Sequence, residues 1–154
     1  MLTVAEIEEI EQSIEGIALE NLNMPDDDGW LLIHSAAYYG NIKLLKFALE
    51  NAKELAVDVA IPGTQMTCLL LAATSGCYDS VKTLLEHGAD INAVDHMNRT
   101  ALHLTNSGKI AELLLEKNIN KNIRDKGNVF SGETALDTAK REGKLAVISA
   151  ISGG

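Results

Sequence analysis

Three consecutive segments decide the fold: Thr67-Cys68-Leu69-Leu70-Leu71-Ala72-Ala73, Val81-Lys82-Thr83-Leu84-Leu85 and Gly88-Ala89-Asp90-Ile91-Asn92. The apolar pattern of the first segment recurs, and the matching positions are Ile33, Leu69, Leu102 and Leu136. They are 36, 33 and 34 residues apart along the chain. A period of about 33 residues is typical of helix-turn-helix units joined by β-turns. The sequence therefore predicts a solenoid of stacked units.

Residues 67 to 92 resemble the ankyrin-repeat family, whose pattern runs T-P-L-H-x-A-A-x-x-G, then paired leucines, then G-A-D-x-N. Four copies in register cover residues 25 to 151. The resemblance implies an all-α ankyrin-repeat solenoid with β-turn fingers. We expect an N-terminal amphipathic capping helix in residues 1-24 and an ankyrin-repeat domain in 25-154, with repeats at approximately 25-60, 61-94, 95-124 and 125-151.

The residue types within each repeat agree with this architecture. Small residues such as Ala72 and Ala73 let neighbouring helices approach closely, and leucine pairs fill the layer between repeats. Glycines at positions 40, 76 and 143 stand where a first helix should end, because glycine accepts the left-handed conformation that terminates helices. Each unit buries apolar surface only against its neighbours.

The repeats depart from the family pattern at several places. Leu31-Leu32 replace the usual Thr-Pro, and Leu70 stands where histidine is expected. The third repeat runs three residues short between His103 and Ile110, which predicts either a shortened first helix or a shortened following turn, and a notch in the binding face. An insertion at residues 126 to 132 lengthens the last finger, and about three extra residues around 51 to 55 extend the second helix of the first repeat.

An amphipathic helix is predicted from Val4 to about Leu22. Thr3 and Glu6 have the spacing of a capping box, and an apolar face is formed by Ile7, Ile10, Ile14 and Ile17. We expect this face to cover the open end of the first repeat, as terminal units of solenoids do. The alternative is a coiled-coil dimerisation seam, for which fewer than three heptads are available.

The net charge of -9 is confined to one end of the chain. Residues 1 to 42 contain nine acids and no Lys or Arg, and the remaining 13 acids balance 13 bases. This charge disfavours nucleic acids and, together with the aromatic residues near it, favours a partner protein with a basic and apolar surface. The alternative, and the commoner case, is a solvated acidic helix without a partner.

The location of the chain is inferred from its cysteines and its apolar runs. No apolar run is long enough to suggest a membrane span. Cys68 and Cys77 are too few for a disulfide scaffold and are expected to be free thiols. We therefore expect a cytoplasmic monomer, or one in the host cytosol if it is a secreted effector.

The sequence lacks motifs for catalysis, metal binding or a cofactor. His34 and His103 fall at the T-P-L-H position, where the resemblance implies a structural hydrogen-bonding role. His87 and His96 do not form a zinc pattern with the two cysteines, and Asp26-Asp27-Asp28 lacks the alternating ligands of a calcium loop. We expect neither an enzyme nor a cofactor.

The remaining function is recognition of another protein. The resemblance implies a concave face made of finger tips and of first-helix residues before the terminating glycine. The partner-binding candidates carried over to this face are Asp27, Asp28, Trp30, Tyr38, Tyr39, Met66, Thr74, Ser75, His96, Met97, Arg99, Phe130 and Arg141. Aromatic residues and arginine often anchor interfaces, although Trp30 or Tyr38 could instead cover the N-terminal helix.

This surface would suit an adaptor, regulator or inhibitor. Two alternatives stay open. One is a microbial effector delivered into a host cell. The other is a regulatory or structural subunit of an enzyme assembly, in which a partner carries out the catalysis.

Overall fold

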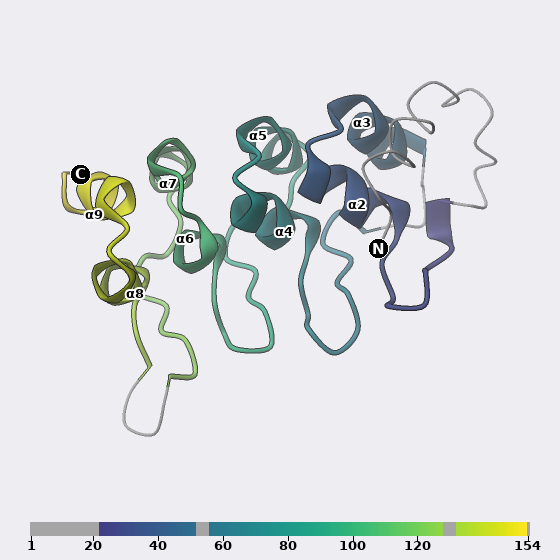
Figure 1. The fold of residues 1–154 in the computed structure, drawn as a ribbon. Coiled ribbons are helices and arrows are strands. Elements are labelled where there is room, and N and C mark those ends of the chain that lie inside the picture. Colours follow the sequence, from purple (N-terminus) through teal and green to yellow (C-terminus); the bar gives the residue numbers. More distant parts are fainter. Residues whose placement is uncertain (1–21, 52–55, 128–131, 154) are drawn as a thin grey trace.

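A computed structural model describes residues 22–51, 56–127 and 132–153. Within these ranges the chain forms helices in pairs: α2 Leu32–Tyr39 with α3 Ile42–Asn51, α4 Cys68–Ser75 with α5 Tyr78–Glu86, α6 Ala101–Leu104 with α7 Gly108–Glu116, and α8 Ala135–Glu142 with α9 Leu145–Ser152. The first helices of the pairs form one row and the second helices another, and fingers project from one side (Figure 1). The described part is thus an all-α solenoid, as the sequence predicts.

Some expected features lie outside the described residues. They are all but the last residues of the N-terminal helix, the extension at 52–55, and the tip of the last finger at 128–131 with Phe130. Leu22, the first described residue, is fully buried and belongs to the hydrophobic core.

The helix ends follow from local sequence. Thr67 precedes α4 in an extended conformation, and its side chain accepts the N–H of Leu70, which satisfies one of the free donors of the first turn. Gly76 ends the same helix with a φ of 80°. Other residues avoid this left-handed region, so glycine permits the sharp turn into α5.

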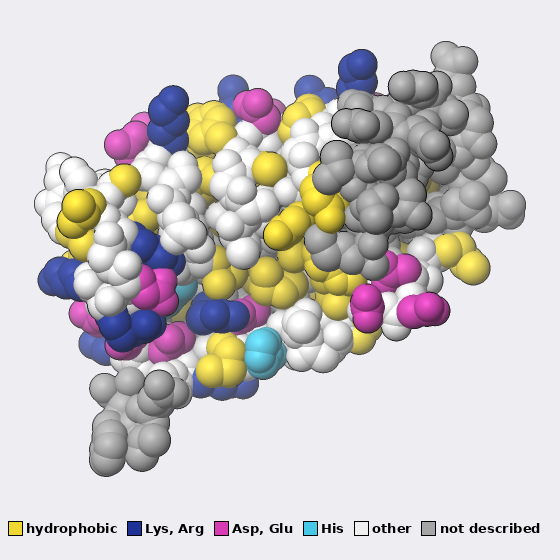
Figure 2. Space-filling view, in the orientation of Figure 1, with side chains coloured by type: hydrophobic (Ala, Val, Ile, Leu, Met, Phe, Trp, Pro, Cys, Tyr) yellow, Lys and Arg dark blue, Asp and Glu magenta, His cyan; other side chains and the backbone are white. Residues whose placement is uncertain are grey.

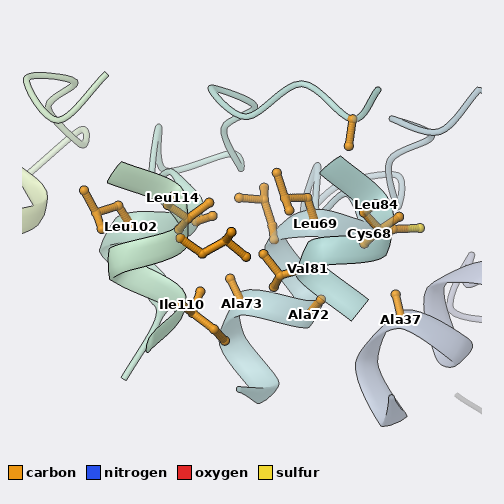
Figure 3. Packing of buried hydrophobic residues seen from close by; sticks show 14 of the residues in the cluster. Ala37, Cys68, Leu69, Ala72, Ala73, Val81, Leu84, Leu102, Ile110 and Leu114 are labelled. Atoms are coloured by element: carbon orange, nitrogen blue, oxygen red, sulfur yellow. The ribbon is translucent and has the colours of Figure 1, made fainter. Parts of the chain in front are cut away.

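The core runs between successive pairs of helices. Ala72 and Ala73 of α4 are completely buried, and leucines such as Leu84 and Leu114 fill the layer beside them (Figure 3). Burying one such leucine contributes about 2 kcal/mol. Because each pair packs on the next, stability should be a sum of terms between neighbours.

The third pair is the irregular one. Helix α6 has four residues, whereas α2, α4 and α8 each have eight. It ends at Thr105 in an extended conformation, without the left-handed glycine of the other first helices. The three residues that this repeat lacks are therefore missing from its first helix, which belongs to the row of helices beside the fingers.

Hydrogen bonds between loops tie successive units together. The N–H of Asp90 donates to the Asp58 carboxylate at 2.9 Å, and the N–H of Asn120 donates to Asn92 Oδ1 at 2.8 Å. These bonds stack the loops that follow α5 and α7 on the loop of the unit before. They fix the register of each pair of helices on its neighbour.

Candidate protein-binding surface

Aspartates hold the turns of the first and third fingers. Asp26 Oδ1 accepts the N–H of Trp30 at 2.8 Å, and Asp95 Oδ1 accepts the N–H of Arg99 at 2.9 Å. Such bonds from the backbone to an aspartate side chain are typical of Asx turns. Trp30 and Arg99 therefore occupy the same position of two fingers, and Met66 occupies it in the second finger, where Ile61 replaces the aspartate.

A histidine after each of these two fingers forms a hydrogen bond to the next unit. His34 Nδ1 accepts the N–H of the residue before α2, and its Nε2–H donates to the Val59 carbonyl at 2.9 Å. His103 repeats the arrangement, with the Glu133 carbonyl as acceptor at 3.1 Å. Burial lowers the pKa of both imidazoles below the ordinary value of 6.5. The structural role that the sequence assigns to both histidines agrees with these bonds.

Three aromatic rings come together where the first finger meets the end of α2. The Trp30 ring lies edge to face with Tyr38 at 5.9 Å between centroids, and Tyr38 lies edge to face with Tyr39 at 5.2 Å. Trp30 also contacts the His34 ring at 6.2 Å. All three rings are partly exposed. We call Trp30, Tyr38 and Tyr39 the aromatic cluster.

The aromatic cluster rests on two units of the solenoid. The Cys77 thiol, which precedes α5, donates to the Tyr38 carbonyl at 3.3 Å. A Cβ added to Gly40 would lie 3.1 Å from Cys77 Sγ, so the two turns approach closely because residue 40 is glycine. Cys68 is buried in the core, and burial raises the pKa of its thiol to about 12. Both cysteines are free thiols.

In the second unit, the candidate residues Thr74 and Ser75 form hydrogen bonds with the backbone of their own helix, α4. Thr74 Oγ1 donates to the Leu70 carbonyl at 2.8 Å, and Ser75 Oγ donates to the Ala72 carbonyl at 3.2 Å. Met66 is partly buried and packs against the core. The hydroxyl groups of Thr74 and Ser75 therefore already donate their hydrogen bonds within α4.

The candidates of the third finger also make bonds that maintain the fold. Arg99 Nε and Nη2 donate to Asp95 Oδ2 at 2.8 and 2.7 Å, and the Asp95 side chain is completely buried. The backbone N–H of His96 donates to the Thr64 carbonyl at 3.0 Å, which joins the second and third fingers. The Met97 carbonyl accepts a bond from the next finger in the same way.

A hollow opens where α6 is short, as the missing residues predict. Its volume is about 500 Å³. Its lining, which we call the charged notch, consists of Met97, Arg99, His103, Leu104, Asn106, Asp125, Gly127, Glu133, Thr138, Arg141, Glu142 and Lys144. Lys144 Nζ donates to the His103 carbonyl at 3.0 Å. The ammonium thus caps the carbonyl end of α6, where helix dipoles favour a cation.

The charges of the notch are paired with one another. Arg141 Nε lies 2.8 Å from Glu133 Oε2, and Lys144 Nζ lies 2.8 Å from Glu142 Oε2. The hydrogen bond from Lys144 lowers the pKa of Glu142. Figure 2 shows these mixed charges over α6 and α8. Sequence reasoning named Arg141 as a candidate but missed Glu133 and Lys144, although the short third repeat predicts the notch itself.

The described residues hold no group of three or more His, Cys, Asp or Glu side chains that could bind a metal ion. Nor does any helix in the described ranges have the length and apolar character needed to cross a membrane. The surface features of the described residues are an aromatic cluster at one end of a row of fingers and a charged notch at the other.

Comparison with known families agrees with this architecture. A model of ankyrin repeats in three copies matches residues 6–95, and a model of a single ankyrin repeat matches residues 97–126. The chain belongs to the ankyrin-repeat family. Ankyrin repeats are protein-protein interaction modules that are generally not catalytic, so the chain is an interaction module of this kind.

Several curated proteins share this similarity. The B-cell lymphoma 3 protein homolog of Mus musculus is 31% identical over 131 residues, which are 82% of this chain and 28% of that protein. The probable 26S proteasome regulatory subunit p28 of Saccharomyces cerevisiae is 33% identical over 102 residues, 62% of this chain and 44% of that protein. The nuclear factor NF-kappa-B p105 subunit of Gallus gallus is 29% identical over 140 residues, 86% of this chain and 14% of that protein. The chain spans less than half the length of each.

Proposed function

We propose that this chain is a non-catalytic adaptor, regulator or inhibitor that binds a partner protein through the concave face, and that the aromatic cluster is the main anchor. The observation that carries the proposal is the contact of Trp30, Tyr38 and Tyr39 in one partly exposed group. Rigid aromatic rings contribute large contact area at small cost in conformational entropy. Their mutual contacts and the Cys77 bond to Tyr38 hold them in place before a partner arrives.

The charge around the aromatic cluster indicates the chemistry of the partner. Asp27 and Asp28 lie in the same finger as Trp30, and all nine acids of residues 1 to 42 belong to this end of the sequence. A partner with basic and apolar groups side by side would meet both features. Carboxylates would raise the rate of encounter, and the rings would supply affinity.

The other candidates on the concave face play a smaller part in this proposal. Thr74 and Ser75 already donate their hydroxyl hydrogen bonds within α4, and Arg99 and Arg141 keep their side chains in ion pairs. The proposal includes a cytoplasmic location, since a reducing compartment suits the free thiols of Cys68 and Cys77. Nucleic acid and membrane are not among the proposed partners.

The experiment is selection from a displayed library of random peptides with the full chain as bait. We expect selected peptides to combine Lys or Arg with apolar residues. Replacing Trp30 and Tyr39 together by Ala should weaken their binding by at least about 2 kcal/mol, because hot-spot residues contribute this much. Tyr78→Ala is the matched control, because Tyr78 is an exposed tyrosine on the helix row away from the fingers.

Circular dichroism must show that the double variant is folded like the wild type. If the folded variant binds the same peptides with unchanged affinity, the aromatic cluster is not the binding site. If Tyr78→Ala weakens binding equally, the peptides dock on the other side of the solenoid.

A second role is suggested by the similarity to a protein named as a proteasome regulatory subunit. The chain would then be a regulatory subunit of an enzyme assembly, with catalysis on the partner. Enzyme activity that co-purifies with the wild-type chain, and not with the Trp30→Ala/Tyr39→Ala variant, would support this role.

A further inference from the structure

The charged notch is a hollow between the third and fourth units. Helix α6 ends at Leu104 after four residues, whereas α4 continues for eight, so the space of the missing turn stays open. The lining comes from the third unit, through Leu104 and Asn106, and from the fourth, through Thr138 and Lys144. Its volume of about 500 Å³ falls within the range of natural ligand pockets, about 300–1,000 Å³. One large side chain of a partner protein can therefore enter it.

The charges of the lining favour a ligand group that is itself uncharged. The lining has three cations and three carboxylates: Arg99, Arg141, Lys144, Asp125, Glu133 and Glu142. Arg141 pairs with Glu133, Lys144 pairs with Glu142, and Arg99 pairs with the buried Asp95. Asp125 Oδ1 accepts the backbone N–H groups of Gly127 and Glu133. A charged ligand group would meet both signs of charge, already paired, and would gain little in return for its lost hydration.

Some polar groups of the notch are still available to a ligand. The groups that make no hydrogen bond within the described part of the chain are Arg99 Nη1, Arg141 Nη1, the side-chain amide of Asn106, and Asp125 Oδ2. They include donors as well as acceptors. A hydroxyl group both donates and accepts hydrogen bonds, and it carries no charge. It therefore suits this set of groups better than an ammonium, which only donates, or a carboxylate, which only accepts.

The arginines of the notch also favour an aromatic ring. Arg99 and Arg141 each use Nε and Nη2 in bonds to carboxylates, and these bonds lie at the edge of the planar guanidinium group. The two side chains are nevertheless 39% and 55% exposed, which leaves guanidinium faces open. Such a face stacks on aromatic rings. Met97 and Leu104 add apolar surface to the lining, and a methionine sulfur makes favourable contacts with rings.

We propose that the charged notch receives a tyrosine side chain of the partner protein. Its ring stacks on the open guanidinium faces and packs on Met97, and its hydroxyl bonds with the free groups of Asp125 and Asn106. The ion pairs keep the walls of the notch in place, so they remain intact when the ring enters. This inference rests on the proposed function, because the tyrosine belongs to the partner that binds the concave face. It adds a second contact at the opposite end from the aromatic cluster.

The experiment is titration of the full chain with N-acetyl-tyrosinamide, an uncharged probe, followed by NMR of the backbone amides. We expect shifts at Leu104, Asn106 and Thr138, with a dissociation constant of about 1 mM for a ligand of this size. The corresponding α-amides of leucine, lysine and glutamic acid should bind at least about threefold more weakly, because they lack the ring or carry a charge. Equal or tighter binding of any of these three overturns the proposal, and so does a lack of shifts at the notch.

A variant that fills the notch locates the binding of the probe. Asn106→Trp should weaken this binding at least about tenfold, because the new side chain occupies the hollow. Asn122→Trp is the matched control, since Asn122 is exposed in the loop after α7 and does not line the notch. It should leave the binding unchanged. Unchanged binding in Asn106→Trp overturns the proposal. Circular dichroism checks that both variants are folded, which is expected because both asparagines are exposed.

The Trp30→Ala/Tyr39→Ala variant separates this inference from the proposed function. It should bind N-acetyl-tyrosinamide at the notch as the wild type does, since its substitutions lie in the first unit. If the probe does not bind at the notch while the library peptides still require the aromatic cluster, the notch proposal alone fails. If the probe binds and the peptides do not require the aromatic cluster, the proposed anchor fails and the notch remains.

Discussion

The first and third units, at the two ends of the concave face, share the same aspartate-held finger turn but present different side chains. At the first unit, Asp26 holds a finger that presents Trp30, and the ring packs on Tyr38. At the third unit, Asp95 holds an equivalent finger that presents Arg99, whose guanidinium returns to the Asp95 carboxylate. The aromatic end therefore leaves its rings partly exposed, whereas the side chains of the charged notch form ion pairs and hydrogen bonds with one another.

This difference follows from the length of the first helix in each unit. Helix α2 has eight residues, and its last turn supplies the two tyrosines. Helix α6 has four, so its carbonyl end lies open and Lys144 occupies the space. Charges in the notch thus compensate for a missing helical turn. We expect substitutions in the notch to change mainly stability, and substitutions in the aromatic cluster to change mainly binding.

The largest expected effect is on stability at the third finger. Asp95→Ala removes a completely buried carboxylate that accepts bonds from Arg99 and from backbone N–H groups. Leaving such donors unsatisfied should lower the free energy of unfolding by about 3 kcal/mol. Urea unfolding measures this loss. An unchanged midpoint would show that the notch does not depend on this pair.

A smaller loss is expected when the cap of α6 is removed. Lys144→Met deletes the ammonium that donates to the His103 carbonyl and should lower the free energy of unfolding by about 1 kcal/mol. Lys140→Met is the control, because that side chain is exposed on the neighbouring helix. Equal losses in the two variants would mean that Lys144 acts through general charge and not as a cap.

The free energy of unfolding should fall in acid because of the buried histidines at both ends of the concave face. Burial lowers the pKa of His34 and His103, so well above pH 6.5 both are neutral in folded and unfolded chains. As the pH falls below 6.5, the unfolded chain takes up protons first, and the free energy of unfolding declines until the folded pKa is reached. Urea midpoints at about pH 7.5 and about pH 5.5 measure the decline.

The histidine at the notch can be separated from the one at the aromatic end. His103→Leu, which copies the natural Leu70 of the second unit, should lower stability at neutral pH and remove part of the acid dependence. If the full dependence on pH persists in this variant, His103 does not contribute to it.

The smallest expected effect concerns the rate of binding at the aromatic end. Replacing Asp27 and Asp28 by Asn should slow association with a basic peptide by about threefold at low salt, because long-range attraction is reduced. Dissociation should change little. Asp79→Asn on α5 is the control. Stopped-flow measurements across a range of salt would show a shallower dependence for the first variant, and an unchanged dependence would mean that these carboxylates do not steer the partner.

The sequence by itself determined the repeated architecture, the helix ends and the shortening of the third repeat, while the structure shows that its first helix is the shortened part. These features depend on contacts within about four residues, or on a period that is visible along the chain. Thr67 and Gly76 frame α4 through such local bonds. The placement of Trp30, Tyr38 and Tyr39 near one another was also expected, because finger and first helix are adjacent in sequence.

Only the tertiary structure decided which side chains already make hydrogen bonds or ion pairs within the protein and which stay exposed to solvent. The Cys77 thiol meets the Tyr38 carbonyl across 39 residues, and Lys144 meets the His103 carbonyl across 41. Such pairs depend on the register of one unit on the next, which side-chain size and loop hydrogen bonds set together.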